Sequence, residues 1–207
     1  MINTDKVTRK YRRNAYYYDF VTQAFSRIRV RAIAQLKLKP GDTVLDFGSG
    51  TGLSFALIES SIGPDGRIVG VELSPSMLAK AREKISKHKW ENIQLIEGNA
   101  EEVNLPPASV DAVLSFYTHD IMSSPRAVER AVEALRPGGI FVAAGSKLAG
   151  RRRGWLLDRI TLAYANTAIT LPLTIDPWRN LEERLGPLKL QEYLLESSYI
   201  ASGVKGS

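Results

Sequence analysis

Two acidic residues stand on either side of a glycine-rich turn, at a spacing that suits recognition of a polar nucleoside. The apolar run Thr43–Phe47 contains Asp46 and ends at the turn Gly48-Ser-Gly-Thr-Gly52. Glycines permit a tight turn and let backbone N–H groups approach a ligand closely. A second apolar run, Arg67–Glu72, ends in an acid 20 residues after Gly52. That separation suits a carboxylate that accepts hydrogen bonds from a ribose diol.

Two ligand classes fit this pattern, a dinucleotide and S-adenosylmethionine, and three details favour the second. Leu53 occupies the place of the third glycine in the dinucleotide pattern G-x-G-x-x-G. Asp46 would repel a pyrophosphate and attract an α-ammonium group. The later turn Glu97-Gly-Asn-Ala-Glu-Glu102 is able to present polar groups to an adenine edge. A glycine turn without a ligand, and one that binds NAD, remain the alternatives.

Apolar runs that alternate with helical patterns predict an α/β fold, a doubly wound, mostly parallel sheet of seven strands. The expected strands are Thr43–Phe47, Arg67–Glu72, Ile93–Glu97, Ala112–Phe116, Gly139–Ala144, Lys189–Glu196 and Ser198–Val204, and the expected helices are Gly52–Ser61, Pro75–His88, Pro125–Leu135 and Asp176–Leu185. The last two strands have no room for a helix between them and predict an antiparallel C-terminal hairpin. We expect one domain over 1–207, with a basic, amphipathic helical arm at 1–36 and an insertion at 147–175 that covers the carboxyl edge of the sheet, on the substrate side.

Four motifs occur in the order and spacing of the class I S-adenosylmethionine-dependent methyltransferases, which this chain resembles from Lys39 to about Gly145. They are VLDFGSGTG, IVGVELSPSML, IEGNAEEVNLP and DAVLSF. The resemblance implies S-adenosyl-L-methionine as cofactor, with its methionine part on Asp46 and the glycine turn and its ribose on Glu72. Its adenine would lie between Leu73 and Met77, with Asn99 and Ala100 facing the exocyclic amine. The implied cofactor-binding residues are Asp46, Gly48, Ser49, Gly50, Gly52, Glu72, Leu73, Met77, Asn99, Ala100 and Ser115. Many relatives carry Asp where Asn99 stands, so we expect weaker or reoriented binding at that point.

Composition and charge narrow the choice of acceptor. The chain contains no cysteine, which excludes a thiol nucleophile and thiolate zinc sites, and its two histidines have no metal-ligand spacing, so we expect no metal. Residues 1–39 hold ten Lys/Arg against two Asp, a balance of +8, whereas the whole chain is +6. Such an arm suits an anionic surface, either lipid or nucleic acid, although a solvated helix face gives the same pattern. Leu114–His119 lacks the Pro-Pro-aromatic motif of nucleic-acid amino methyltransferases, so we expect no nucleic-acid partner.

Two basic clusters with neighbouring aromatic residues favour attachment to an anionic phospholipid membrane surface. At about 100° per residue, Val7, Tyr11, Ala15 and Tyr18 line one stripe of a helix whose other faces are basic. Arg151, Arg152 and Arg153 precede Trp155 in a second cluster, as at a headgroup boundary. No uncharged stretch reaches the roughly 20 apolar residues of a spanning helix. We therefore expect a cytoplasmic, peripherally membrane-associated protein.

The segments YRRNAYYYDF, SFYTHD and DPWRNLEERL resemble those of bacterial phospholipid N-methyltransferases, which convert phosphatidylethanolamine towards phosphatidylcholine. The resemblance implies a phospholipid substrate, whose ammonium aromatic rings could surround. For this substrate His119 is the first candidate to accept the amine proton, directly or through water, with Asp120 as its orienting partner, although neighbouring side chains on a strand or extended loop usually point apart. A polar loop residue without a catalytic role is the alternative for His119. The catalytic candidates are His119, Tyr18 and Tyr117, and the substrate-binding candidates are Tyr16, Tyr18, Arg151, Arg152 and Arg153. Quinone C-methyltransferases share the core motifs and a Tyr-Asp helix, so a quinone-type or other small-molecule methyltransferase is an alternative. A nucleic-acid-binding protein with the methyltransferase fold is another.

Overall fold

Seven strands form one sheet in the computed structural model, which describes residues 26–148, 173–193 and 197–206. The sheet order is β3-β2-β1-β4-β5-β7-β6. The strands are β1 (Thr43–Phe47), β2 (Arg67–Glu72), β3 (Ile93–Glu97), β4 (Val110–Phe116), β5 (Leu135–Ser146), β6 (Lys189–Tyr193) and β7 (Ser198–Val204). The helices are α2 (Ser26–Gln35), α3 (Phe55–Ile62), α4 (Pro75–His88), α5 (His119–Met122), α6 (Pro125–Ala134) and α8 (Arg179–Leu185).

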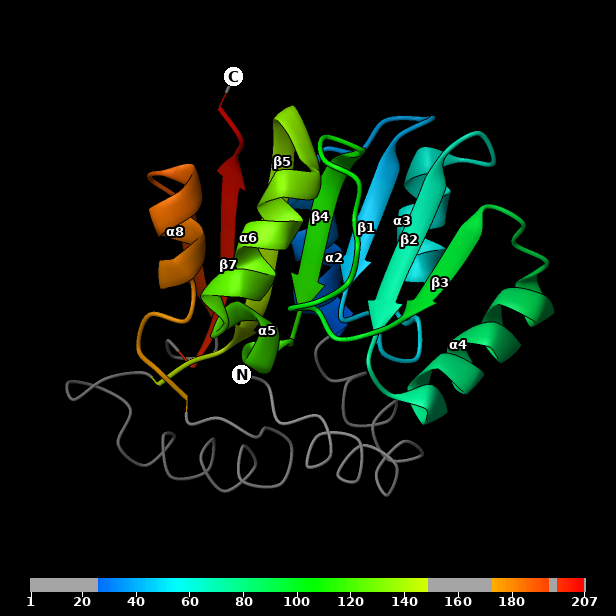
Figure 1. The fold of residues 1–207 in the computed structure, drawn as a ribbon, viewed down its shortest axis with the longest axis horizontal. Coiled ribbons are helices and arrows are strands. Elements are labelled where there is room, and N and C mark those ends of the chain that lie inside the picture. The colour runs from blue at the N-terminus through cyan, green and yellow to red at the C-terminus, as the bar shows by residue number, and fades with distance from the viewer. Residues whose placement is uncertain (1–25, 149–172, 194–196, 207) are drawn as a thin grey trace.

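The chain order reverses direction across the sheet between β1 and β4. From β1 the chain builds β2 and β3 on one side and then returns to place β4 and β5 on the other, all parallel to β1. Strand β7 runs antiparallel to both β5 and β6, and Figure 1 shows its arrowhead opposed to those of β1, β2 and β4. In such sheets the carboxyl ends of the strands beside the reversal form the usual ligand crevice.

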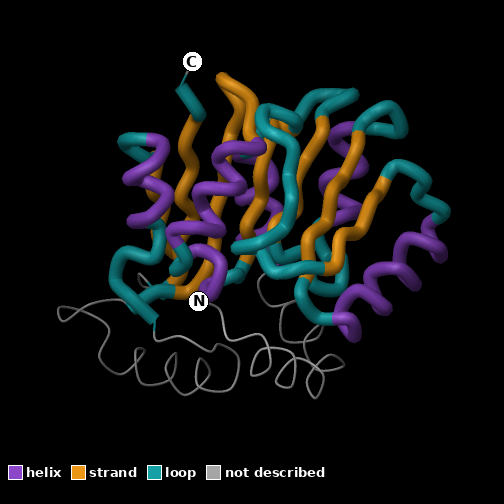
Figure 2. Tube along the Cα trace, viewed as in Figure 1, coloured by secondary structure: helices purple, strands orange, loops and turns teal. Residues whose placement is uncertain are grey.

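Two apolar layers cover the sheet, and β1 shows how the sequence builds them. Val44 packs in the cluster that includes α2 and α3, whereas Leu45 and Phe47 pack in the cluster with α6 and α8. Alternate residues of a strand point to opposite faces, so a strand buried on both sides is apolar almost throughout. Figure 2 shows the helices on the two sides of the central strands. Asp46 interrupts this apolar strand, since it is only 2% exposed and lies on the α2 face with Val44.

The predicted α/β sheet and its antiparallel C-terminal hairpin are confirmed. Strands β1, β2, β3 and β7 and helix α4 have the expected bounds, while β4 and β5 are longer and the other helices begin or end a few residues away. Helix α3 starts at Phe55 and not at Gly52, because Gly48, Gly50 and Gly52 all have positive φ angles. Helix α5 is a correction, because its residues were expected in an extended loop. Of the expected arm, the structure describes residues 26–36, which include α2, and of the expected insertion it describes residues 147–148 and 173–175; the rest of both segments lies outside the described residues.

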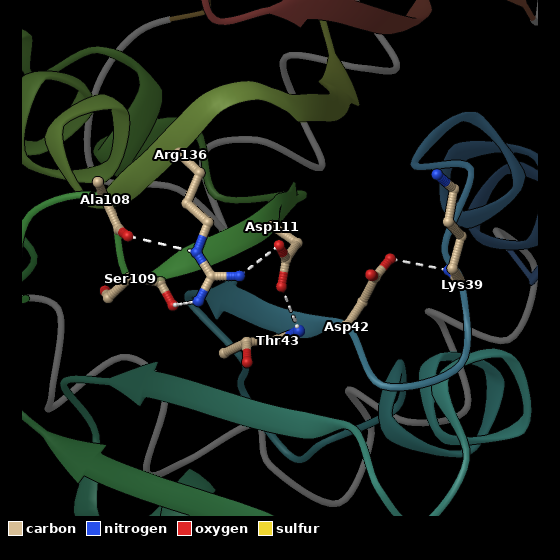
Figure 3. Close-up of polar contacts among 7 residues, drawn as sticks. All are labelled: Lys39, Asp42, Thr43, Ala108, Ser109, Asp111 and Arg136. Atoms are coloured by element: carbon tan, nitrogen blue, oxygen red, sulfur yellow. Dashed lines mark hydrogen bonds and ion pairs between the residues drawn. The ribbon is translucent and has the colours of Figure 1, made fainter.

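The amino ends of the central strands are held together by a closed polar network (Figure 3). Arg136, at the start of β5, pairs through Nη1 with Asp111 Oδ1 at 2.6 Å, and the other Asp111 oxygen accepts the Thr43 N–H at 2.8 Å. The same guanidinium donates to the carbonyls of Ala108 and Ser109. Asp111, on β4, thus connects the beginnings of β1 and β5, because it contacts both Thr43 and Arg136. Within the described ranges, no helix is both long and apolar enough to cross a membrane.

Candidate functional site

The glycine turn after β1 has a backbone shape that only glycine adopts without strain. Gly48 and Gly50 have φ angles of +88° and +56°, in the left-handed region. The N–H groups of Gly48 and Ser49 both donate to the Val71 carbonyl, at 2.9 and 3.0 Å, which fixes the turn to the end of β2. A Cβ on Gly48 would lie 2.3 Å from Thr118 Cγ2, whereas a Cβ on Gly50 would meet nothing within 4 Å. Gly48 therefore permits close packing, and Gly50 faces open space.

Glu72 joins the two loops that border this space. Its Oε2 accepts the Gly50 N–H at 3.0 Å, and its Oε1 accepts the Ser74 N–H at 2.8 Å. Burial raises the pKa of the Glu72 carboxyl, and the hydrogen bonds from Ser74 and Gly50 oppose that rise. Each carboxylate oxygen keeps further lone pairs. The side chain is thus already oriented to accept hydrogen bonds from a ligand diol.

Asp46 is the most unusual group at this edge of the sheet. Burial raises the pKa of its carboxyl to about 7, the positive charge of Arg29 opposes the rise, and the negative charge of Glu72 adds to it. Its Oδ2 finds no hydrogen-bond partner in the described part of the chain. A buried acceptor left without a partner carries a large desolvation penalty. This carboxylate suits a cationic ligand group that donates hydrogen bonds.

Two clefts meet at the glycine turn and share Gly48, Gly50 and Tyr117. The larger encloses about 680 Å³, including space open to solvent, and the smaller about 370 Å³. Asp46 and Ser49 line only the smaller cleft. The larger cleft is lined by the predicted adenosine-side residues Glu72, Leu73, Met77, Asn99 and Ala100, and by Tyr117, Thr118, His119, Asp120 and Ile121 from β4 and α5. The structure thus gathers the cofactor candidates from β1, β2 and β3 around one continuous space.

Three predicted residues have structural contacts that define their position more closely. The Asn99 side-chain oxygen accepts the Glu101 N–H at 3.0 Å, so it also closes the turn after β3. Ser115 is fully buried, and its hydroxyl contacts the Phe47 carbonyl at 3.5 Å and the Thr118 hydroxyl. Gly52 is buried too, and its N–H donates to the Ser49 carbonyl at 2.9 Å. Ser115 and Gly52 support the turn from behind and do not belong to the lining of either cleft.

The acceptor side of the larger cleft is built from the end of β4 and from α5. Tyr117 is a non-glycine residue with φ +59°, and its N–H donates to the Ala144 carbonyl at 2.7 Å. This left-handed residue turns the chain sharply at the end of β4. His119 is 8% exposed and begins α5, with its Nε2 3.4 Å from the Ser123 hydroxyl. Asp120 follows it on the helix, and Asp120 Oδ1 is buried without a partner among the described residues.

The expected arrangement of His119 and Asp120 is therefore corrected, while both residues line the same cleft. They succeed one another on a helix, where side chains point about 100° apart, so the extended-loop geometry does not apply. The remaining acceptor candidates, Tyr16, Tyr18 and Arg151–Arg153, lie outside the described residues. The other histidine, His88, is exposed and stacks on Trp90 with ring centroids 4.4 Å apart.

Among the lining residues that the sequence reasoning missed are two polar side chains placed beside the predicted cofactor residues. Arg29 lines the smaller cleft from α2, and Thr118 lines the larger cleft beside Gly48. Arg29 was counted only as one charge of the basic arm. Its spacing from Ile28, Ala32 and Ile33 on the buried face of α2 was the available signal, since an arginine on an apolar face requires a polar destination. Among the described residues, no group of three or more His, Asp or Glu side chains is placed to hold a metal ion.

Comparison with known proteins finds similarity to methyltransferases. Residues 44–139 match the profile of the Methyltransferase domain family. The chain is also similar to solved methyltransferase structures that cover most of its length. One is a SAM-dependent methyltransferase from Aquifex aeolicus, with 17% identity, coverage of 86% of this chain and 92% of the other, and a TM-score of 0.64. Another is phosphoethanolamine N-methyltransferase 2 of Haemonchus contortus in complex with S-adenosyl-L-methionine, with 16% identity, coverage of 87% and 53%, and a TM-score of 0.70.

Curated relatives are similar to about half to two thirds of the chain. An arsenite methyltransferase of Halobacterium salinarum is 36% identical over 49% of this chain and 26% of its own length. Demethylmenaquinone methyltransferases of Symbiobacterium thermophilum and Listeria monocytogenes are 30% and 28% identical, over 53% and 65% of this chain and 45% and 60% of their own lengths. This chain therefore spans between about a quarter and three fifths of the length of these relatives. Residues 44–139 thus match a methyltransferase domain, and the described part of the chain has the fold of the solved methyltransferases.

Proposed function

We propose that this protein transfers a methyl group from S-adenosylmethionine, which it binds across the two clefts at the glycine turn. The observation that carries the proposal is Asp46, a buried carboxylate whose Oδ2 has no partner in the described residues, on the side of the turn that opens into the smaller cleft. The ammonium of the methionine part satisfies this oxygen. Glu72 accepts from the ribose hydroxyls, and Met77 and Leu73 contact the adenine.

A dinucleotide is a poorer ligand for the same geometry. Its pyrophosphate would lie against the turn, where Asp46 and Glu72 place two carboxylates. The negative charges of the pyrophosphate and of these two carboxylates would repel one another strongly in a site partly shielded from water. The test is calorimetric titration of the protein with S-adenosylhomocysteine and, separately, with NAD. We expect heat of binding only with the first, and binding of NAD alone would reject the donor.

For the acceptor, we favour an apolar aromatic molecule of the quinol type. Two of the similar curated proteins are demethylmenaquinone methyltransferases, and the acceptor side of the larger cleft presents Tyr117 and Ile121 to a ring. None of the described residues that line this cleft is a lysine or an arginine, so none of them offers a cation to an acceptor phosphate. Arsenite fits less well, because arsenic(III) is a soft centre that favours thiolates and the chain contains no cysteine.

The residues of α5 supply the proton chemistry. When bound, S-adenosylmethionine provides an electrophilic methyl group, and its sulfur keeps the electron pair of the broken bond. A quinol ring carbon that takes up this methyl group must lose its proton, and His119 is placed to accept it because it lines the cleft and a neutral imidazole has one nitrogen that accepts a proton. Tyr117 aligns the ring against the turn. Alignment matters most here, since displacement requires the reacting atoms in line at about 3–3.5 Å.

The corresponding test separates chemistry from cofactor binding. His119→Ala is expected to lower kcat about 100-fold or more and to leave the affinity for S-adenosylhomocysteine within about twofold. His88→Ala is the matched control, since it removes the other histidine, which lies exposed at the end of α4. Equal activity of His119→Ala and His88→Ala would remove His119 from the mechanism.

A phospholipid amine is the second candidate acceptor, and the charge distribution favours it. The balance of +8 over residues 1–39 suits an anionic membrane surface, which would bring the larger cleft to a headgroup. Labelled S-adenosylmethionine is offered with demethylmenaquinol in neutral detergent, with phosphatidylethanolamine in neutral vesicles, and with the same lipid in anionic vesicles. Label in the quinol supports the first candidate, and label in the lipid only with anionic vesicles supports the second. Label in neither would leave another small molecule as acceptor and reject both.

A further inference from the structure

The smaller cleft contains one charged residue that the proposed function has not used. Arg29 comes from the buried face of α2 and is only 7% exposed. Its guanidinium carbon lies 4.6 Å from the centroid of the Phe116 ring, at the end of β4. Arg27 and Arg31, the other arginines of α2, are exposed. The helix therefore delivers a single arginine to the interior and leaves two at the surface.

Arg29 lies in the cleft together with Asp46, Ser49 and Thr51. The positive charge of Arg29 lowers the pKa of the Asp46 carboxyl, against the larger effect of burial. The two side chains thus offer a positive and a negative group to the same small space, and the Ser49 hydroxyl beside them has no partner among the described residues. An α-amino acid has the complementary pair of charges, an ammonium and a carboxylate on one carbon.

We propose that Arg29 binds the α-carboxylate of the donor's methionine part, so that Arg29 and Asp46 together read both charges of the amino acid. The inference rests on the proposed function, because it places the methionine part in the smaller cleft. A planar guanidinium presents its N–H groups as a fork that matches the two oxygens of a carboxylate. Arg29 precedes the matched segment 44–139, so this contact is supplied by the part of the chain before the methyltransferase domain profile.

A purely structural role of Arg29 would predict a different pattern of ligand affinities. If Arg29 served only to fasten α2 onto Phe116, its removal would weaken every ligand of the site to a similar extent. A carboxylate-binding role predicts a loss confined to ligands that carry the carboxylate. The informative pair is therefore S-adenosylmethionine and decarboxylated S-adenosylmethionine, which differ only in this group.

The experiment measures Kd for both compounds by calorimetry with the full chain and three variants, Arg29→Met, Arg29→Lys and Arg27→Met. We expect the unchanged protein and Arg27→Met to prefer the carboxylated compound by about 30-fold, as one charge-assisted contact provides. Arg29→Met should lose about 30-fold for that compound and leave the decarboxylated one within about twofold, and Arg29→Lys should fall between them. Thermal melting of each variant identifies any that fails to fold, in which case Arg29→Lys carries the test.

This design distinguishes failure of the Arg29 contact from failure of the proposed function. A similar loss for both compounds in Arg29→Met, or an unchanged preference, overturns the carboxylate contact while leaving the donor assignment intact. Absence of binding of either compound to the unchanged protein overturns the proposed function itself, and the role of Arg29 with it.

Discussion

Both ends of the sheet contain a buried or half-buried aspartate, and the two aspartates differ in whether their oxygens have hydrogen-bond partners. At the amino ends of the strands, Asp111 has both oxygens engaged, by Arg136 and by the Thr43 N–H. At the carboxyl ends, Asp46 has an oxygen without a partner among the described residues, although Asp46 is more deeply buried than Asp111. Left-handed backbone residues occur at both ends, among them Gly48, Gly50 and Tyr117 at the carboxyl end and Gly41 and Ala108 at the amino end, so the two ends differ in the partners of their aspartates and not in the backbone.

This difference separates the structural end of the sheet from the functional one. Closed networks stabilise the start of the strands, where nothing needs to bind. Buried polar groups without partners destabilise a fold, and they persist where a ligand supplies the missing interactions. The contrast predicts that substitutions at the carboxyl end change ligand affinity more than stability, and that substitutions at the amino end do the reverse.

The largest effect is expected from Glu72→Ala. Loss of the carboxylate releases the Gly50 and Ser74 N–H groups as well as the ribose contact, so affinity for S-adenosylhomocysteine should fall at least about 100-fold. Glu97→Ala is the control, because Glu97 is exposed at the end of the neighbouring strand, in register with Glu72. Calorimetry measures both, and equal affinities for the two variants would break the contrast between the ends of the sheet.

Asp46→Asn should weaken donor binding and strengthen the fold. We expect about a 30-fold loss of affinity for S-adenosylmethionine, because the amide keeps an acceptor but no charge. The Asp46 carboxyl has a pKa of about 7 in the folded protein against 3.8 in the unfolded chain. Folding therefore favours the protonated form, and the native protein loses stability as pH rises from about 4 to about 7.

Above that range the Asn variant should be the more stable protein, by about 1 to 4 kcal/mol in the free energy of unfolding. Urea unfolding of both proteins at about pH 8 and about pH 4 checks the sign, since the advantage should shrink at the lower pH. An Asn variant that is less stable at both pH values would mean that Asp46 has a stabilising partner.

The same carboxyl makes donor binding depend on pH. Only the ionised Asp46 pairs with the donor ammonium, so affinity for S-adenosylmethionine should fall by up to about tenfold between pH 8 and pH 6. Calorimetry at the two pH values tests this in the unchanged protein and in Asp46→Asn, for which the pH dependence should be lost. A dependence that persists in the variant would have to come from a different group.

The smallest effect on ligand binding is expected at the opposite end of the sheet. Arg136→Met breaks a half-exposed ion pair and two hydrogen bonds to carbonyls, and should cost about 1 kcal/mol of stability. Affinity for S-adenosylhomocysteine should stay within about twofold. Loss of affinity with unchanged stability would show that the two ends are coupled through β1 and β4.

Much of the fold was predictable because its signals are local. The strand Thr43–Phe47 and the helix Pro75–His88 were predicted with the bounds that the structure shows, since a buried parallel strand is an apolar run and Pro75 begins a helix after a serine. Helix α5 was missed because four residues carry no periodic pattern. The cofactor candidates from Asp46 to Ala100 converge as expected, because they follow successive parallel strands. Ser115 and Gly52 lie behind the cleft, a placement that spacing along the chain does not reveal.

The sequence by itself determined which segments along the chain form strands, the glycine turn and the two acids that flank it, because these depend on residue type and on separation along the chain. The tertiary structure alone decided which charges meet. Asp46 and Arg29 are far apart in the sequence and share one cleft only because α2 packs on the face of β1 to which Asp46 points. Burial at that contact, which no local pattern encodes, is what raises the pKa of Asp46 and leaves its oxygen available to a ligand.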